Sequence, residues 1–272
     1  MSATTRRLLR RLGLLDPLRD LKLRLTYPQQ LEERRRFELF YSQFIRPGDL
    51  CFDVGANKGA RAEIFLRLGA RVVAVEPLPK CIAMMESAFA GCRGLHLVQA
   101  AAGSAPGEAR IMVGEASFTS TINQEWASAV SESGRFSHQW HESIAVPVTT
   151  LDQLIKQFGS PVFCKVDVEG YELEVLRGLS ELPQALSFEF TPEVIEIAVG
   201  CLERLSGQGS VRCNYSLGES ALFQLDEWVD AGRMIDVLRG INDPDHRIFG
   251  DVYVRRQNKP FGSAARLSTV RQ

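Results

Sequence analysis

An aspartate and two glycines follow a short apolar run in the segment Asp53-Val54-Gly55-Ala56-Asn57-Lys58-Gly59. Residues 50–53, which end at this aspartate, have the character of a buried strand, and residues 60–68 predict a helix. A strand that enters a glycine turn and then a helix brings bare backbone N–H groups close to whatever binds above the strand end. We therefore expect a ligand site at the carboxyl end of this strand.

The spacing of these residues bears on the identity of the ligand. A dinucleotide-binding turn reads G-x-G-x-x-G, but the middle glycine is missing between Gly55 and Gly59. A carboxylate at Asp53 is unfavourable beside a diphosphate and favourable beside an ammonium or sulfonium group. The pattern D-x-G-x-N-x-G resembles the first motif of class I S-adenosylmethionine-dependent methyltransferases. A structural tight turn in another α/β protein is the alternative.

Glu76 ends a second apolar run, residues 71–76. It follows Gly55 by about the interval at which an acidic residue meets ribose hydroxyls in doubly wound folds. A carboxylate accepts two hydroxyl protons well, which suits a ribose. A helix-capping or surface glutamate is the alternative, and the position at a strand end favours the ribose role.

A second strand-and-turn motif spans residues 162–172 and contains two acids, Asp167 and Glu169. The apolar residues before them predict a strand that brings both acids to the carboxyl edge of the sheet, and Gly170 permits the turn into the next helix. Side chains alternate along a strand, so only one acid faces the crevice directly, and we predict that it is Asp167. Two roles stay open for Glu169: positioning the substrate or accepting its proton, or stabilising the N-terminus of the following helix.

The longest polar stretch, residues 117–142, predicts a loop long enough to be functional. His138 and His141 lie in this stretch about one helical turn apart, and one of them could act as a general base. A metal site would need a further ligand that the sequence does not place. We therefore predict no metal site. The catalytic candidates are Asp167, Glu169, His138 and His141.

Length and composition limit the protein class. The 272 residues are 45% hydrophobic and 24% charged, enough for one sizeable core in one elaborated domain. A net charge of −1 gives no sign of a nucleic-acid partner. The six cysteines include no C-x-x-C pair, no apolar run is long enough for a membrane span, and no secretory signal is visible. We expect a reduced, cytoplasmic protein.

Residues 1–26 are rich in leucine and arginine, and Leu8, Leu9, Leu12 and Leu15 fall at helical spacing. Two interpretations fit such a cationic amphipathic segment. Its leucines can pack on the domain while its arginines stay in water, or the segment can meet an anionic membrane surface or a partner. We favour the first interpretation, in which the leucines pack on the domain.

Three motifs in order carry a resemblance to a known family: DVGANKG from residue 53, TTLDQLI from residue 149 and KVDVEGYE from residue 165. Together they strongly resemble the FkbM-type methyltransferases, over about residues 46–190. The resemblance implies an α/β fold with a doubly wound, seven-stranded, mostly parallel sheet whose final strand is reversed. We accordingly divide the chain into a basic helical extension (1–45), an S-adenosylmethionine-binding methyltransferase domain (46–254) and a flexible tail (255–272).

The resemblance also assigns residues to a cofactor, S-adenosyl-L-methionine. It implies that the glycine turn lines the methionine half, that Glu76 holds the ribose, and that Asp167 faces the amine and the substrate. Related chains often place an acidic or polar residue against adenine, where this chain has Ala100-Ala101-Ala102. The full set of predicted cofactor-binding residues is Asp53, Gly55, Ala56, Asn57, Gly59, Glu76, Pro77, Ala101 and Asp167.

The activity expected from the resemblance is methylation of a hydroxyl oxygen on a sugar or another small natural product. Two other functions fit the same layout. An NAD(P)-binding oxidoreductase would share Glu76 but lacks its glycine fingerprint here, and a non-catalytic protein on this scaffold would bind S-adenosylhomocysteine weakly or not at all. The acceptor is not encoded in any motif, and we expect residues 1–45 and 117–142 to select it.

Overall fold

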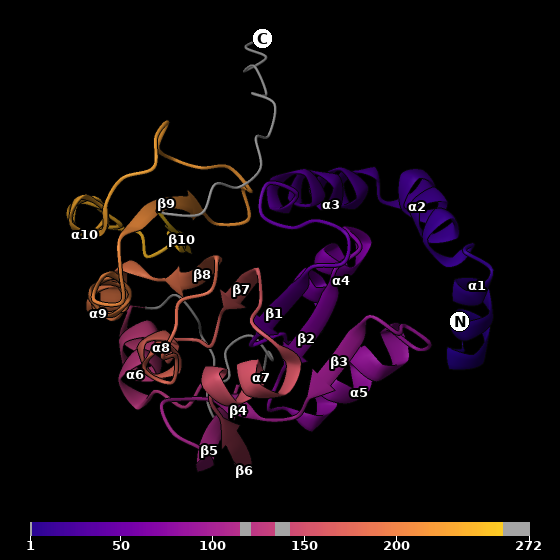
Figure 1. Cartoon of the computed structure of the whole chain (residues 1–272), viewed down its shortest axis with the longest axis horizontal. Helices are drawn as coiled ribbons and strands as arrows, with labels where there is room; N and C mark the ends of the chain where they lie inside the picture. Colours follow the sequence, from indigo (N-terminus) through magenta and orange to yellow (C-terminus); the bar gives the residue numbers. More distant parts are fainter. Residues whose placement is uncertain (1, 115–120, 134–141, 258–272) are drawn as a thin grey trace.

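A computed structural model describes residues 2–114, 121–133 and 142–257 (Figure 1). The predictions for His138 and His141, and most of the predicted tail, lie outside these residues. The tail was expected to begin at residue 255, but the last strand continues to Arg256 because Arg255 and Arg256 pair with the neighbouring strand.

A seven-stranded sheet forms the centre of the fold. All strands run in one direction except β10, which is antiparallel to both of its neighbours. This arrangement confirms the predicted doubly wound, mostly parallel sheet with a reversed final strand. In spatial order the strands are β3 (Leu95–Val98), β2 (Arg71–Val75), β1 (Leu50–Val54), β7 (Phe163–Val166), β8 (Ala185–Phe190), β10 (Gly250–Arg256) and β9 (Val211–Leu217).

Helices cover both faces of this sheet, and a small second sheet lies beside its carboxyl edge. The second sheet has the order β4 (Ala101–Ala102), β6 (Glu142–Thr149) and β5 (Gly107–Val113). The helices are α1 (Ala3–Arg11), α2 (Leu15–Thr26), α3 (Pro28–Tyr41), α4 (Ala60–Arg67), α5 (Pro79–Ala88), α6 (Gln124–Glu132), α7 (Leu151–Phe158), α8 (Glu172–Arg177), α9 (Ile195–Ser206) and α10 (Ala231–Arg239), with a 3-10 turn at Pro192–Val194. Within the described residues, none of the helices is long and apolar enough to cross a bilayer.

Alternation along the strands divides the core into two layers. Phe52 and Val73 belong to a cluster with residues of α7 to α10, whereas Cys51 and Val72 belong to a cluster with residues of α3 to α5. Successive side chains of a strand point to opposite faces, so one apolar run supplies both layers. This is why the buried strands read as continuous apolar runs in the sequence.

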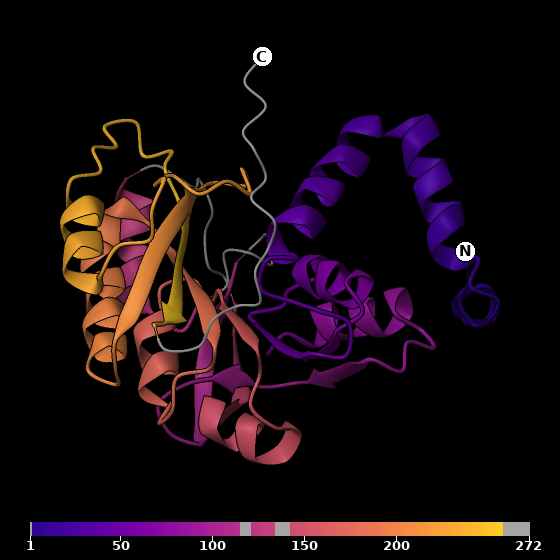
Figure 2. The same ribbon diagram turned by 45° about the horizontal axis from the view of Figure 1, so that its top comes forward.

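The helices α1 and α2 lie beyond the edge of the sheet (Figures 1 and 2). Leu8 and Leu12 are 58% and 59% exposed, although Leu15 is buried. Arg6 and Arg10 instead donate hydrogen bonds to backbone carbonyls in and just after α5. The favoured prediction for residues 1–26 is therefore wrong, because these arginines contact the domain while most of the leucines face water.

The order of the strands places a topological switch point between β1 and β7. From β1 the chain proceeds outward through β2 and β3, and it later returns to the other side of β1 at β7. The Asp167 N–H donates to the Val54 carbonyl at 2.9 Å, which brings the two strand ends together. Open α/β sheets bind ligands at such a point, outside the carboxyl ends of the strands.

Gly250 offers a test of the packing at β10. A Cβ atom there would lie 2.0 Å from the Ser216 carbonyl oxygen on β9. We expect Gly250→Ala to lower the free energy of unfolding by about 1–3 kcal/mol, because β9 and β10 would have to move apart. Gly232→Ala in α10 is the matched control and should stabilise by up to about 1 kcal/mol. Urea denaturation compares the two variants, and equal unfolding free energies would contradict the expectation.

Candidate active site

Gly55 brings the ends of β1 and β7 into direct contact. Its φ is +82°, and an added Cβ would lie only 1.7 Å from the Asp167 carbonyl oxygen. The Gly55 and Ala56 N–H groups donate to the Val75 carbonyl at 2.9 and 3.0 Å. A residue with a side chain fits neither this backbone conformation nor this space. The glycine therefore permits three strand ends to meet around one point.

Glu76 secures the turn that follows Gly55. Its Oε2 accepts the Asn57 N–H at 2.8 Å, and its Oε1 accepts the Leu78 N–H at 2.9 Å. Burial raises the pKa of Glu76, and these two hydrogen bonds oppose that rise. Each carboxylate oxygen has a second lone pair, so Glu76 can still accept hydroxyl protons from a ligand.

The loop after β7 contains a non-glycine residue in a left-handed conformation, Glu169, with φ +55°. The Glu172 Oε1 atom accepts the N–H groups of Val168 and Gly170 at 3.0 and 3.2 Å, on either side of it. Backbone strain of this kind persists only where the surroundings fix it, and it gathers at functional sites. Glu172 thus positions the loop that carries Glu169.

The segment 121–126 secures the same loop from the opposite side. Thr121 Oγ1 donates to the Glu169 carbonyl and Asn123 Nδ2 to the Gly170 carbonyl, both at 2.6 Å. The Trp126 ring lies so close that a Cβ on Gly170 would be 2.3 Å from it. Residues from the insert between β5 and β6 therefore fix the position of the catalytic candidates.

Lys165 is 3% exposed in the middle of the sheet and lies between two aspartates. Its Nζ is 2.8 Å from Asp167 Oδ2 and 3.1 Å from Asp251 Oδ1. Burial disfavours the ammonium, but the two carboxylates outweigh it and raise the pKa of Lys165. Burial likewise opposes ionisation of Asp167, but Lys165 outweighs it and holds the pKa of Asp167 below its usual range. Both groups are therefore charged at neutral pH.

Two cavities open at the switch point and share four lining residues: Gly55, Asn57, Asp167 and Glu169. The second cavity has a volume of about 430 Å³, within the range of small-molecule sites, and the first is smaller, about 100 Å³. The first cavity is bounded by Glu76, Thr121 and Tyr171 and by aliphatic side chains. The second is bounded by charged and aromatic side chains, including those of Lys165, Arg61, Glu189, Trp126 and Phe249.

Three carboxylates converge where the cavities meet. Asp167, Glu169 and Glu189 each offer an oxygen within 4.8 Å of the others. Burial raises the pKa of both Glu169 and Glu189, and the neighbouring carboxylates raise both further. Such a group can accept protons from hydroxyls or surround a cation.

The structure brings most of the predicted site residues together, but in two cavities. Glu76, Pro77 and Ala101 line the first cavity, and Asp53 and Ala56 line the second. The buried Asp53 also accepts the Ala62 N–H at 2.9 Å and so stabilises the first turn of α4.

Two parts of the prediction lie elsewhere. Gly59, with φ +82°, begins α4 and packs near Phe89 and Met85, and it is not among the residues that line either cavity. His138 and His141 lie outside the described residues, so their role as a base stays a prediction.

Sequence reasoning gave no role to Lys165, Glu189 or Glu172. Two of them could have been noticed in the sequence. Lys165 and Glu189 are each a charged residue within a mostly apolar strand. Lys, Glu and Asp are rarely buried without a partner, so such a residue indicates a buried ion pair or a site.

Glu172 gives the site a pH dependence. Burial raises its pKa to about 7, so its ionisation opposes folding as pH rises from the unfolded-state value near 4.5 through 7. We expect Glu172→Gln to gain stability relative to the parent chain over that range, by up to about 3 kcal/mol. Chemical denaturation at a series of pH values measures this difference. Parallel pH curves for the two proteins would contradict it.

The comparison with known proteins agrees with this geometry. The sequence profile of the methyltransferase FkbM domain matches residues 53–239, more than half of the chain. No curated protein matches the chain.

Solved structures also match the chain, at low identity. A precorrin-6y C5,15-methyltransferase from Geobacter metallireducens GS-15 matches with a TM-score of 0.42 and 11% identity, over 81% of this chain and 87% of that one. An O-methyltransferase from Bacillus cereus in complex with SAH matches with a TM-score of 0.40 and 11% identity, over 83% and 80% of the two chains. On the evidence of the profile match, the chain belongs to the FkbM methyltransferase family, and its cofactor is S-adenosyl-L-methionine.

Proposed function

We propose that this methyltransferase methylates a hydroxyl oxygen on a sugar or another small natural product. The observation that supports this most directly is the junction of the two cavities at Gly55, Asn57, Asp167 and Glu169. A transfer reaction needs the donor and the acceptor to approach along one line with water excluded. Two cavities that meet at a ring of carboxylates provide such an approach.

The first cavity fits the cofactor. Glu76 can accept the two ribose hydroxyls through the lone pairs that its backbone hydrogen bonds leave. The side chains of Leu78, Ala101, Ile111 and Ile122 line the same cavity and present apolar surface to a flat ring such as adenine. In this proposal the alanines at 100–102 contact adenine through their apolar surface, where related chains often make a polar contact.

When bound, S-adenosylmethionine supplies an electrophilic methyl group on a sulfonium that departs as a thioether. The chain's own contribution begins with Asp167, whose ionised carboxylate lies at the junction of the cavities and favours a cation there. The bond to Lys165 fixes the Asp167 side chain, so that its charge is oriented before the ligand arrives.

The second cavity fits a polyhydroxylated acceptor. Its carboxylates, including those of Glu189 and Glu219, accept hydrogen bonds from hydroxyls. Thr191 also lines this cavity, and its buried Oγ1 has no hydrogen-bond partner among the described residues. The Trp126 and Phe249 rings add apolar surface for the carbon face of a sugar.

In this proposal Glu169 is the general base. Asp167 is a poor base because Lys165 lowers its pKa, whereas burial and neighbouring carboxylates raise the pKa of Glu169. A base whose pKa lies nearer the working pH transfers a proton more effectively. Glu169 also lines both cavities, where it can take the proton of the acceptor hydroxyl.

Calorimetric titration tests the cofactor assignment. We expect the chain to bind S-adenosylhomocysteine, and Glu76→Gln to weaken that binding about 10- to 100-fold, because a charged acceptor of two hydroxyls is lost. Glu203→Gln, on an exposed position of α9, is the matched control and should change the affinity less than about twofold. Tighter binding of NAD than of S-adenosylhomocysteine would overturn the assignment.

Initial rates of S-adenosylhomocysteine formation test the base. With a panel of methyl glycosides as acceptors, we expect kcat/KM to rise with pH as Glu169 ionises, above the ordinary glutamate pKa of 4.5. Glu169→Gln should lower kcat/KM about 10²- to 10⁴-fold and abolish the rise, because the base is removed. Glu189→Gln should raise KM and keep the rise. If only Glu189→Gln abolishes the rise of kcat/KM with pH, Glu189 is the general base. If neither variant abolishes it, neither glutamate is the base.

A further inference from the structure

The helix α2 exposes a row of leucines. Leu14, Leu18, Leu21 and Leu25 are 47%, 47%, 53% and 76% exposed. They recur at intervals of four, three and four residues, which places them on one face of a helix. Single exposed leucines are ordinary, but a continuous apolar face in water indicates an interaction surface.

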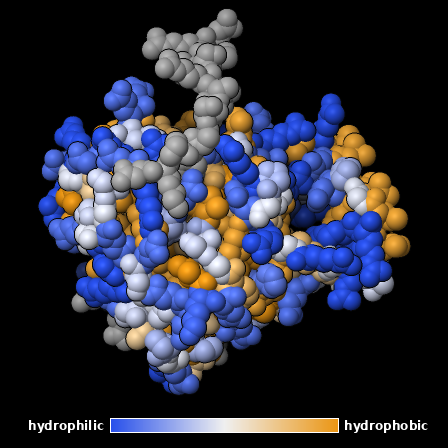
Figure 3. All heavy atoms as spheres, viewed as in Figure 1, coloured by the Kyte–Doolittle hydropathy of each residue, from blue (hydrophilic) through white to orange (hydrophobic). Residues whose placement is uncertain are grey.

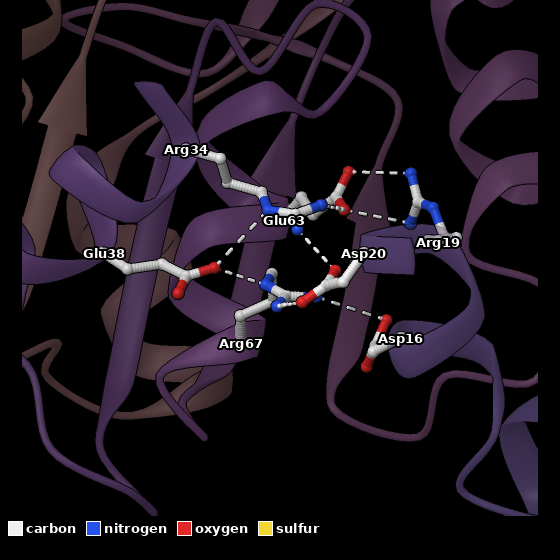
Figure 4. Close-up of polar contacts among 7 residues, drawn as sticks. All are labelled: Asp16, Arg19, Asp20, Arg34, Glu38, Glu63 and Arg67. Carbon is white, nitrogen blue, oxygen red and sulfur yellow. Dashed lines mark hydrogen bonds and ion pairs between the residues drawn. The ribbon is translucent and has the colours of Figure 1, made fainter. Parts of the chain in front are cut away.

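The opposite face of α2 is fixed to the domain by ion pairs (Figure 4). Arg19 pairs with Glu63 on α4 at 2.9 Å, and Asp20 pairs with Arg67 on α4 at 2.9 Å. Asp20 also pairs with Arg34 on α3. Since Arg19 and Asp20 both point inward, the leucine row must point outward.

The helix α1 has the same orientation. Arg6 and Arg10, one turn apart, donate hydrogen bonds to the Ser87 and Ala90 carbonyls at 2.7 and 2.8 Å. The opposite side of α1 carries the exposed Leu8 and Leu12. The two leucine rows approach each other in the chain at Gly13, and Figure 3 shows apolar side chains at the edge of the molecule where α1 and α2 lie.

Basic side chains flank both rows. Arg7 and Arg11 on α1, and Lys22 and Arg24 on α2, are exposed, although the stem of Arg7 also lies beside Gly91 on the domain. Within the described part of the chain, none of these four forms an ion pair with a carboxylate. Asp16 and Asp20, the two acids of these helices, are directed toward Arg67 on the domain side. The exposed face is therefore apolar and positively charged.

We propose that α1 and α2 form a docking surface for an anionic lipid bilayer. Leucines bordered by arginine and lysine match an interface in which acyl chains lie beneath negative headgroups. A second copy of this chain fits less well, because it would bring the four basic residues against four like charges. Helices of nine and twelve residues are too short to span a bilayer, so they lie on the surface.

Vesicle co-sedimentation of the full chain tests this. We expect binding to vesicles of phosphatidylcholine with about one third phosphatidylserine, and much weaker binding to phosphatidylcholine alone. Leu18→Ala/Leu21→Ala/Leu25→Ala should lower the partition coefficient about tenfold or more. Lys22→Gln/Arg24→Gln should lower it about fivefold per charge on the anionic vesicles only.

Matched controls come from exposed positions outside α1 and α2. Leu222→Ala removes a leucine that is 60% exposed, and Arg233→Gln/Arg247→Gln removes two exposed charges. Both should bind as the parent chain does. All the changed side chains are exposed, so thermal unfolding should be unaltered and verifies folding.

Three results would overturn the proposal. They are no binding to anionic vesicles, losses in the controls equal to those in the leucine and basic variants, or a dimer in light scattering whose dissociation in the triple leucine variant leaves vesicle binding unchanged. The last result would assign the surface to a second copy.

Discussion

The buried ammonium of Lys165 is the interaction on which the site depends. A charge in the middle of a sheet is tolerated only when it is paired, and Asp167 in the loop after β7 and Asp251 on β10 pair with it. Removal of one partner from such a group is strongly destabilising, whereas in the intact group each charge has an oppositely charged partner. Because Lys165 neutralises Asp167, two more carboxylates, Glu169 and Glu189, can gather nearby at the price of raised pKa values. The same interaction thus stabilises the sheet and makes a base available.

The loop from Asp167 to Gly170 sets the position of Glu169. Two glycines are required around it, Gly55 because β1 passes against the Asp167 carbonyl, and Gly170 because the Trp126 ring covers it. Hydrogen bonds from Thr121 and Asn123 and to Glu172 hold Glu169 in its left-handed conformation. The insert between β5 and β6 is therefore part of the catalytic framework as well as a wall of the second cavity.

Local patterns explain what the sequence could predict. A strand run, a glycine at positive φ and a following helix are all encoded within a few residues, so the turn at Gly55 and the acids Glu76 and Asp167 were placed at the correct strand ends. The partner of Lys165 is 86 residues away, and nothing local indicates that Asp251 will lie beside it. For α2 the leucine spacing predicts a helix, but which face meets the domain depends on Glu63 and Arg67 on α4, which only the fold brings near.

The helix α4 connects these features physically. Ala60 and Arg61 at its start line the second cavity, and Asp53 accepts the Ala62 N–H in its first turn. Arg67 at its end pairs with α2. Seven residues of α-helix span about 10 Å, so the wall of the second cavity and the attachment of the leucine-rich helix belong to one short element. The ion pairs of Glu63 and Arg67 therefore attach α2 to the same helix whose first turn forms part of the wall of the second cavity.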